Sequence, residues 1–458
     1  MILKSFAVFL PALAAGFGLV HLIWKNDHGI ALILKIFLGS GLGLGITSCL
    51  YFLRLLLFPG QGGYLLIECI FLTLILIALF VQKRISLDIS PRFLPLSQIQ
   101  ILLSLTVILI GVVAISFLLA YARFAPHGDY DAQAIWNLRA RFIYRSGDVW
   151  EHAFSPLVNR NFHMDYPLLI PLSVVGGWNT LGSEVLRIPT VLSALFFFSI
   201  AGVVFSVIAY LRTLSQAALA VMILLATPGL LLFTTFQTAD IPLTYFFLAS
   251  AGLFVLAGKE NHRGLLVLSG MMAGFSAWTK NEGIPFVIVM ILYTSIVFGI
   301  LKAGRTFFSL LAGMSFPLLT IGLFKIVISA NNDLFTSNAL SEIVSKVFDP
   351  TRYAQILTHL TTELFRLGNW PISIILVLFV YGAIMGIKRP GSFAEKFVWI
   401  IPLSQFVVYL LIYLITPHDL EWHLNYSMSR LLIHLFPMAL CSFFLFVNPP
   451  ETVINKVQ

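Results

Sequence analysis

The sequence predicts an all-α polytopic membrane protein. Of its 458 residues, 59% are hydrophobic and only 10% are charged, and the mean hydropathy is +0.94. Soluble domains carry about 25% charged residues, so this composition excludes a soluble protein. Apolar runs of about 17–25 residues, the length that crosses a bilayer as a helix, recur along the chain.

About thirteen of these runs are expected to form transmembrane helices. The final apolar run starts close to Arg430, and three runs lie before residue 98. The expected ranges are 3–24, 30–57, 62–82, 99–123, 188–210, 216–234, 241–257, 264–279, 284–302, 306–329, 369–387, 396–416 and 429–447.

Short basic loops predict how the helices are oriented. Lysines and arginines near membrane spans mark the cytoplasmic side, which explains the net charge of +8 without a nucleic-acid surface. All basic loops lie on that side only if the apolar run 167–182 does not cross. Its two prolines and three glycines favour a re-entrant or interfacial helix. The loops 124–187 and 330–368 are then external.

The chain is expected to have four parts. Residues 1–98 hold three N-terminal transmembrane helices, and residues 99–329 form a core that includes the external loop 124–187. Residues 330–368 are an external loop, and residues 369–458 hold the C-terminal transmembrane helices. Helical spacing of apolar residues in the 330–368 loop predicts two amphipathic surface helices. This loop is either a lid over a site or a plain connector.

Carboxylates concentrate in the external loop 124–187. Asp129 and Asp131 stand in GDYDAQAIW, and Asp165 stands in MDYPLLIPL. A carboxylate there can take a proton from an acceptor group, and Asp131 is the first candidate, with Asp129 second. The alternative is that Asp131 and Asp165 cap the helices that follow them. If a divalent cation such as Mg²⁺ or Mn²⁺ binds, Asp131 and Asp165 are its expected ligands.

Other predicted external loops carry groups suited to a phosphate. Arg430 stands at the mouth of the last span with His434 one turn deeper, and it either binds phosphate or pairs with Glu421 or Asp165. Lys280 in SAWTKNEG either holds a lipid phosphate or extends toward the headgroups. Asp240 in ADIPLTYFF is either a helix cap or part of a phosphate-attracting helix start.

Taken in chain order, the sequence motifs make the chain resemble the polyprenyl-phosphate-sugar-dependent glycosyltransferases of GT-C fold. The similarity is to bacterial members akin to protein O-mannosyltransferases and to the lipid A aminoarabinose transferase. The pieces that carry it are GDYDAQAIW followed by SGDVW, MDYPLLIPL ending in NTLG, RIPTVLSALF, ADIPLTYFF and GMMAGFSAWTK. They cover roughly 125–290. The chain departs from the family in having several spans before the acidic element, where one is usual.

The resemblance implies a GT-C-like bundle whose core is 99–329. It implies transfer of a sugar from a polyprenyl-phosphate donor to a glycan, lipid or protein acceptor, with inversion and with Asp131 as general base. The implied location is a bacterial inner membrane, with the site on the external (periplasmic) face. The implied donor-phosphate or substrate-binding residues are Lys280, Arg430, His423, His434, Asp240, Arg187 and Tyr166. The alternatives are a lipid-linked glycan polymerase or ligase and a transporter of lipid-linked sugars.

Overall fold

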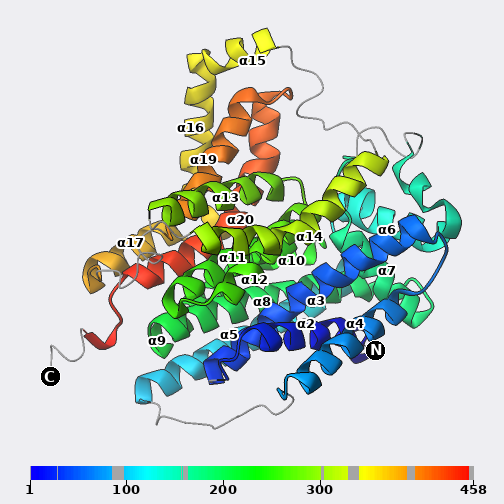
Figure 1. Cartoon of the computed structure of the whole chain (residues 1–458). Coiled ribbons are helices and arrows are strands. Elements are labelled where there is room, and N and C mark those ends of the chain that lie inside the picture. The colour runs from blue at the N-terminus through cyan, green and yellow to red at the C-terminus, as the bar shows by residue number, and fades with distance from the viewer. Residues whose placement is uncertain are drawn as a thin grey trace.

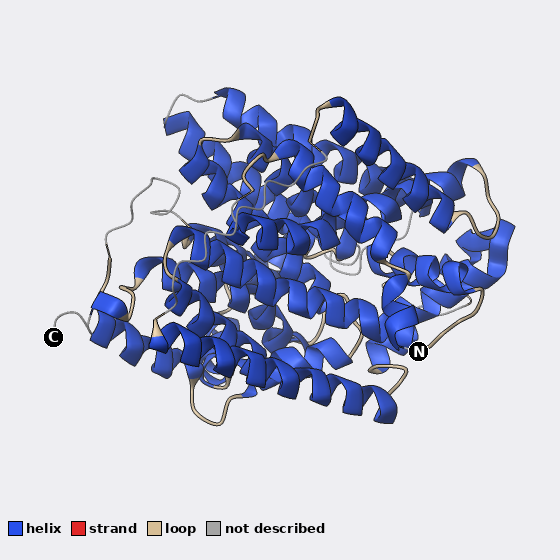
Figure 2. Ribbon diagram, turned by 90° about the horizontal axis from the view of Figure 1, so that it is seen from below, coloured by secondary structure: helices blue, strands red, loops and turns tan. Residues whose placement is uncertain are grey.

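The computed structural model of the protein is built from helices (Figures 1 and 2). It describes residues 2–27, 29–84, 97–155, 157, 163–300, 304–328, 340–388 and 398–452. Over these ranges no strand forms, and the one isolated β-bridge joins Ile387 to Val447. The predicted all-α fold class is confirmed.

The N-terminal part of the chain, which includes the polar loop, holds eight α-helices, one π-helical turn and one 3-10 helix. In order, they are α1 (Ile2–Ala7), α2 (Leu10–Ile23), α3 (Gly29–Leu57), α4 (Tyr64–Val81), α5 (Gln98–Phe124), the π-helical turn η1 (Ala132–Trp136), α6 (Asn137–Ser146), the 3-10 helix η2 (Gly147–Phe154), α7 (Leu169–Leu181) and α8 (Arg187–Leu211).

The remaining helices form the centre and the C-terminal part. They are α9 (Leu214–Ala226), α10 (Pro228–Thr235), α11 (Asp240–Glu260), α12 (Arg263–Thr279), α13 (Gly283–Ile300), α14 (Gly304–Ile328), α15 (Leu340–Val347), α16 (Pro350–Phe365), η3 (Leu367–Asn369), α17 (Ile374–Met385), α19 (Ile400–Ile415) and α20 (Leu420–Phe446).

Seven of the described helices are long and apolar enough to cross a membrane, namely α3, α4, α5, α8, α11, α14 and α20. The number is nine if the bent pairs α9–α10 and α16–α17 each form one span. Shorter apolar helices include α2, α13, α19 and α7. The last of these is only 13 residues long, in keeping with the run predicted not to cross. The total of about thirteen spans stays a prediction.

Helix α11 lies at the centre of the bundle. It packs against α8, α12 and α20, and 94% of its most apolar window is buried (Figure 1). By contrast, only 11% of the corresponding window of α5 is buried, so this helix turns most of its surface outward. A helix that is apolar on all sides belongs in a core or in lipid. The first residue of α11 is therefore placed deep inside the protein.

Glycines let two helix pairs approach closely. A Cβ at Gly313 of α14 would overlap the carbonyl oxygen of Val267 in α12, and one at Gly270 would overlap that of Leu310. A Cβ at Gly43 of α3 would overlap the carbonyl oxygen of Ala12 in α2. Small residues at such crossings replace the hydrophobic driving force that lipid removes, because they allow backbone-to-backbone packing.

The two predicted surface helices of the 330–368 loop correspond to α15 and α16, which project from one end of the bundle beside α19 (Figure 1). Ile356 and Leu360 are the buried residues of α16, which packs against α20. Residues 330–339 of that loop lie outside the described residues. Its role as a lid stays a prediction.

Candidate active site

Asp240 is the centre of a buried ion cluster. Its side chain is 0% exposed, and its Oδ1 accepts hydrogen bonds from Lys280 Nζ at 2.9 Å and His434 Nε2 at 2.8 Å. Its Oδ2 accepts from an Nη of Arg430 and from the Thr238 hydroxyl, both at 2.7 Å. The expectation that Asp240 caps α11 is wrong, because no side-chain cap bond forms there.

Arg430 connects this buried cluster to Asp131. Its other Nη donates to Asp131 Oδ2 at 2.6 Å, and both side chains are about a quarter exposed, 25% for the arginine and 28% for the aspartate. The prediction that Arg430 pairs with Glu421 or Asp165 is wrong. So is the cap at Asp131, since η1 begins without a side-chain cap bond. Asp131 and Arg430 form the accessible edge of a cluster whose interior is closed.

Lys280 extends into the protein. The alternative that its side chain extends outward to the lipid headgroups is therefore wrong. Lys280 is 5% exposed, directly follows the last residue of α12, and also pairs with Glu282 Oε1 at 2.7 Å. Burial alone would lower the pKa of Lys280, but the carboxylates of Asp240 and Glu282 raise it above its usual value. Burial would raise the pKa of Glu282, but Lys280 and His434 lower it below its usual value. Both groups therefore stay charged at neutral pH.

Asp165 stands in a second, adjacent cluster. Its Oδ2 accepts from Asn281 Nδ2 at 2.7 Å and faces Lys325 Nζ at 3.2 Å. Lys325 also donates to Asn281 Oδ1 at 3.0 Å. Helix α7 begins at Leu169 without a side-chain cap bond, so the cap expected at Asp165 is wrong. Asn281 lies between Lys280 and Glu282 in the chain, so one turn after α12 serves both clusters.

Tyr166 forms an aromatic stack beside the clusters. Its ring lies 5.4 Å from that of Trp136 and 4.5 Å from that of His163, nearly parallel to both. Lys280 Nζ lies 6.0 Å from the centre of the same ring. Arg139 donates to the carbonyl oxygens of Tyr166 and His163, and burial lowers its pKa to about 10. The stack fixes the loop that carries Asp165 onto η1 and α6.

Three predicted residues lie apart from the ion cluster. His423 Nδ1 contacts the Thr416 hydroxyl at 2.9 Å. Arg187 is exposed at the start of α8. Asp129 is exposed too, and its backbone N–H donates to the carbonyl oxygen of Phe236 at 3.2 Å. The structure thus joins Asp131, Asp240, Lys280, Arg430 and His434, with Asp165 and Tyr166 beside them.

Sequence reasoning missed three residues of this site. Lys325, Asn281 and Glu282 complete the charge and hydrogen-bond pattern. An intramembrane lysine is costly unless it is paired, so the position of Lys325 inside an apolar run indicated that it has a charged partner. Asn281 and Glu282 were conspicuous only as neighbours of Lys280.

The carboxylates do not assemble a metal site within the described residues. No group of three or more His, Cys, Asp or Glu side chains there could hold an ion. Asp131 is paired with Arg430 and Asp165 with Lys325, so each already has a cationic partner from the chain. The donor set expected for Mg²⁺ or Mn²⁺ on Asp131 and Asp165 does not fit this arrangement.

Residues 175–325 match the sequence model of the dolichyl-phosphate-mannose-protein mannosyltransferase family, a GT-C family. The match covers about a third of the chain and includes Asp240, Lys280 and Lys325. No curated protein and no solved structure matches the chain significantly. The resemblance predicted from the motifs is confirmed over this range. With the apolar helices, it supports an integral, multi-pass membrane glycosyltransferase of the GT-C type.

Proposed function

We propose that the protein transfers a sugar from a polyprenyl-phosphate-linked donor to an acceptor on the external face of a bacterial cell membrane. The observation that carries the proposal is the Asp131–Arg430–Asp240 chain of charges. It places a partly exposed carboxylate and a partly exposed guanidinium side by side, anchored on a buried carboxylate. A sugar phosphodiester needs both groups, a base for the acceptor and a cation for the leaving phosphate.

Arg430 and Lys325 are the proposed contacts of the donor phosphate. Their side chains are 25% and 29% exposed, whereas Lys280 and His434 are closed off, 6% and 0% exposed, against Asp240. Lys280 and His434 therefore act as positioning residues, which hold Asp240 and through it Arg430. Arginine suits the phosphate because its planar fork matches two oxygens at once.

Binding of the donor would release the base. In the structure, Arg430 donates to Asp131 Oδ2 at 2.6 Å, so the guanidinium occupies the carboxylate oxygen that would accept a proton. A phosphate that takes over this Nη of Arg430 leaves Asp131 free to accept a proton. The base then becomes active only when the donor is in place.

The proposed reaction is one displacement at the anomeric carbon. The acceptor hydroxyl gives its proton to Asp131, and its oxygen forms the new bond to the anomeric carbon. The bond from that carbon to the phosphate oxygen breaks, and polyprenyl phosphate leaves with an additional negative charge beside Arg430 and Lys325. Attack opposite the leaving group inverts the anomeric centre.

Transfer by the purified protein in proteoliposomes tests this function. The assay uses polyprenyl-phosphate-linked hexoses and pentoses and measures release of polyprenyl phosphate. We expect Asp131→Asn to lower kcat by about 10²- to 10⁴-fold, the usual contribution of a general base. Asp129→Asn is the matched control, because its exposed carboxylate makes no hydrogen bond with any described residue. Transfer retained in Asp131→Asn, or donor that crosses the bilayer without release of polyprenyl phosphate, would refute the proposal.

A further inference from the structure

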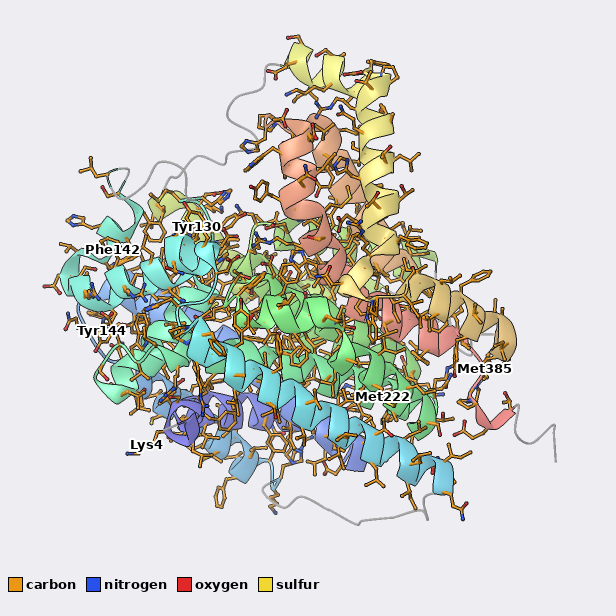
Figure 3. The ribbon with its side chains drawn as sticks, turned by 180° about the vertical axis from the view of Figure 1, so that it is seen from behind. Lys4, Tyr130, Phe142, Tyr144, Met222 and Met385 are labelled. Carbon is orange, nitrogen blue, oxygen red and sulfur yellow. The ribbon has the colours of Figure 1, made fainter. Side chains whose placement is uncertain are left out.

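An apolar groove of about 1280 Å³ separates the N-terminal helices from the core. Side chains of α1, α2, α3, α5 and α8 line it. Figure 3 shows α5 crossing the molecule, with Lys4 of α1 below the end that leads to Tyr130. Small-molecule pockets usually measure about 300–1,000 Å³, so this groove suits a larger apolar ligand.

The lining of the groove is mostly apolar, and one of its walls is a helix that faces outward. Helix α5, which forms one wall, turns most of its apolar surface outward and is long enough to span a membrane. Phe6, Phe17, Phe37 and Phe198 contribute aromatic lining. An apolar groove that opens to a bilayer is filled by lipid chains, since no polar solvent competes for it.

Two unpaired arginines mark one end of the groove. Arg123, from the last turn of α5, and Arg187, from the first turn of α8, are the charged residues of its lining, and no carboxylate lines it. Neither guanidinium has a hydrogen bond or ion pair with any residue that the structure describes. A single arginine at a helix end can simply reach the headgroups. Two of them on different helices, facing one groove, form a binding site for a phosphate.

The same end of the groove adjoins the candidate active site through Gln237. This side chain is buried, and its Nε2 donates to the Pro126 carbonyl oxygen at 3.1 Å and to the Thr190 hydroxyl at 3.0 Å. Both of these residues line the groove. Its Oε1 accepts from Asn137 at 3.0 Å, and Asp240 follows in the next turn of chain. The segment from Pro126 to Asp131 leads directly from the groove to the proposed base.

We propose that the groove binds the acceptor, an anionic phospholipid with two hydrocarbon chains and a free hydroxyl in its headgroup. Its phosphate lies on Arg123 and Arg187, and its hydroxyl reaches Asp131. This inference rests on the proposed function. Asp131 lies only five positions after Pro126 of the groove lining, which is why the headgroup hydroxyl is assigned to it. The hydroxyl oxygen bonds to the anomeric carbon, its proton passes to Asp131, and polyprenyl phosphate leaves.

Binding is tested without any donor, by native mass spectrometry of the full chain in detergent. The probes are dioleoylphosphatidylglycerol, dioleoylphosphatidylcholine and undecaprenyl phosphate. We expect one phosphatidylglycerol to be retained in preference to the other two. Arg123→Gln/Arg187→Gln should weaken its binding at least about tenfold, as loss of charge-assisted hydrogen bonds does. Ala14→Trp, at an exposed position of the lining, should block it, and Arg263→Gln, an exposed arginine outside the groove, should leave it unchanged.

Transfer is then followed with labelled donors and phosphatidylglycerol in the vesicles. Label in the phospholipid fraction, with a KM for phosphatidylglycerol raised in the double arginine variant, supports the inference. Equal retention of phosphatidylglycerol by wild type and double variant overturns it. Preference for undecaprenyl phosphate overturns it too, because the groove then serves the donor. Label on protein or water-soluble glycan overturns the acceptor role and leaves the proposed function standing. Absence of transfer with every donor counts against the proposed function, while the binding result is judged separately.

Discussion

Asp131 and Arg430 are separated by 299 residues in the chain, yet their side chains meet at 2.6 Å. The opposite Nη of the same arginine meets Asp240 at 2.7 Å. One planar guanidinium thus bridges a buried carboxylate and an accessible one. This bridge ties the polar loop after α5 to the first turn of α11 and to the middle of α20.

Replacement of Arg430 by lysine should impair both the bridge and transfer. A lysine ammonium is a compact point charge and cannot present two parallel donors to two carboxylates. We expect kcat for Arg430→Lys to fall by about 10²- to 10³-fold, the cost of one lost donor to a developing anion. Arg263→Lys is the control, because that arginine is exposed far from the site. Wild-type kcat in Arg430→Lys would contradict the bridge as a functional element.

Asp240→Asn should destabilise the protein by about 3–5 kcal/mol. The substitution keeps the shape of the side chain but leaves Lys280 and Arg430 without their buried counter-charge. Unfolding in detergent, followed by tryptophan fluorescence, measures the loss. Asp419→Ala is the comparison, because Asp419 caps α20 by accepting a hydrogen bond from the Trp422 N–H at 2.8 Å. Loss of a cap costs about 1 kcal/mol. If the Asp240 variant loses no more than this, the buried cluster does not stabilise the fold.

Partial recovery of stability in a double variant would identify the cause. Asp240→Asn/Lys280→Met removes one buried cation together with the anion, so it should be more stable than Asp240→Asn alone. Neighbouring charges of this kind do not act additively. Additive losses in the double variant would show that Asp240 and Lys280 stabilise the protein independently.

The long helices and several residues of the candidate site could be predicted from the sequence, because they depend on local patterns. Long apolar runs predicted the spans, and the polar loop 124–187 stood out between two of them. Helical spacing placed His434 one turn after Arg430, and the structure puts both on Asp240. Helical spacing follows from the local sequence and can be recognised without knowing which distant residues are in contact.

The partners of each charge could not be predicted. An aspartate before a helix looks the same whether it caps that helix or faces an arginine 190 residues away, as Asp240 does. Capping was an alternative for Asp131 and Asp165 and one of two readings for Asp240, and in the structure all three are ion-pair carboxylates. Lys325 lies inside an apolar helix, and only the folded structure brings it to Asp165. The local sequence fixes the helix start, and the tertiary fold decides what the side chain binds.

The contribution of Glu282 to stability should depend on pH. Its pKa in the folded protein lies below the ordinary value of 4.5, so its stabilisation is complete above that value and disappears as the pH falls through the folded pKa. The pKa of Lys280 lies above its ordinary value of 10.5, so its stabilisation is complete below 10.5 and disappears as the pH rises through the folded pKa. The stability difference between wild type and Glu282→Gln should therefore be constant from about pH 5 to about pH 10 and shrink in acid and alkali.

Unfolding in detergent across this pH range measures that difference. Glu342→Gln is the control, since Glu342 is 46% exposed and pairs with Lys346 one turn along α15. An exposed pair of this type contributes about 0.5 kcal/mol or less. A Glu282→Gln difference that stays constant below pH 4 would contradict a lowered pKa for Glu282.

Gly313→Leu should separate α14 from α12 and thereby disturb the site. Any Cβ at Gly313 overlaps the backbone of Val267, and backbone cannot move aside as a flexible side chain can. Overpacking of a core costs about 1–3 kcal/mol, and a backbone clash lies at the upper end of this range. Lys325 lies further along α14 and contacts Asp165, so transfer should fall together with stability.

Gly322→Leu provides the matched control for this crossing. It lies on the same helix, and a Cβ there meets nothing within 4 Å. The substitution adds the same side chain to α14 and replaces the same flexible residue, which by itself favours the helix. We expect near wild-type unfolding and transfer in Gly322→Leu, and loss of both in Gly313→Leu. Equal behaviour of the two variants would show that the close approach of α12 and α14 does not hold Lys325 against Asp165.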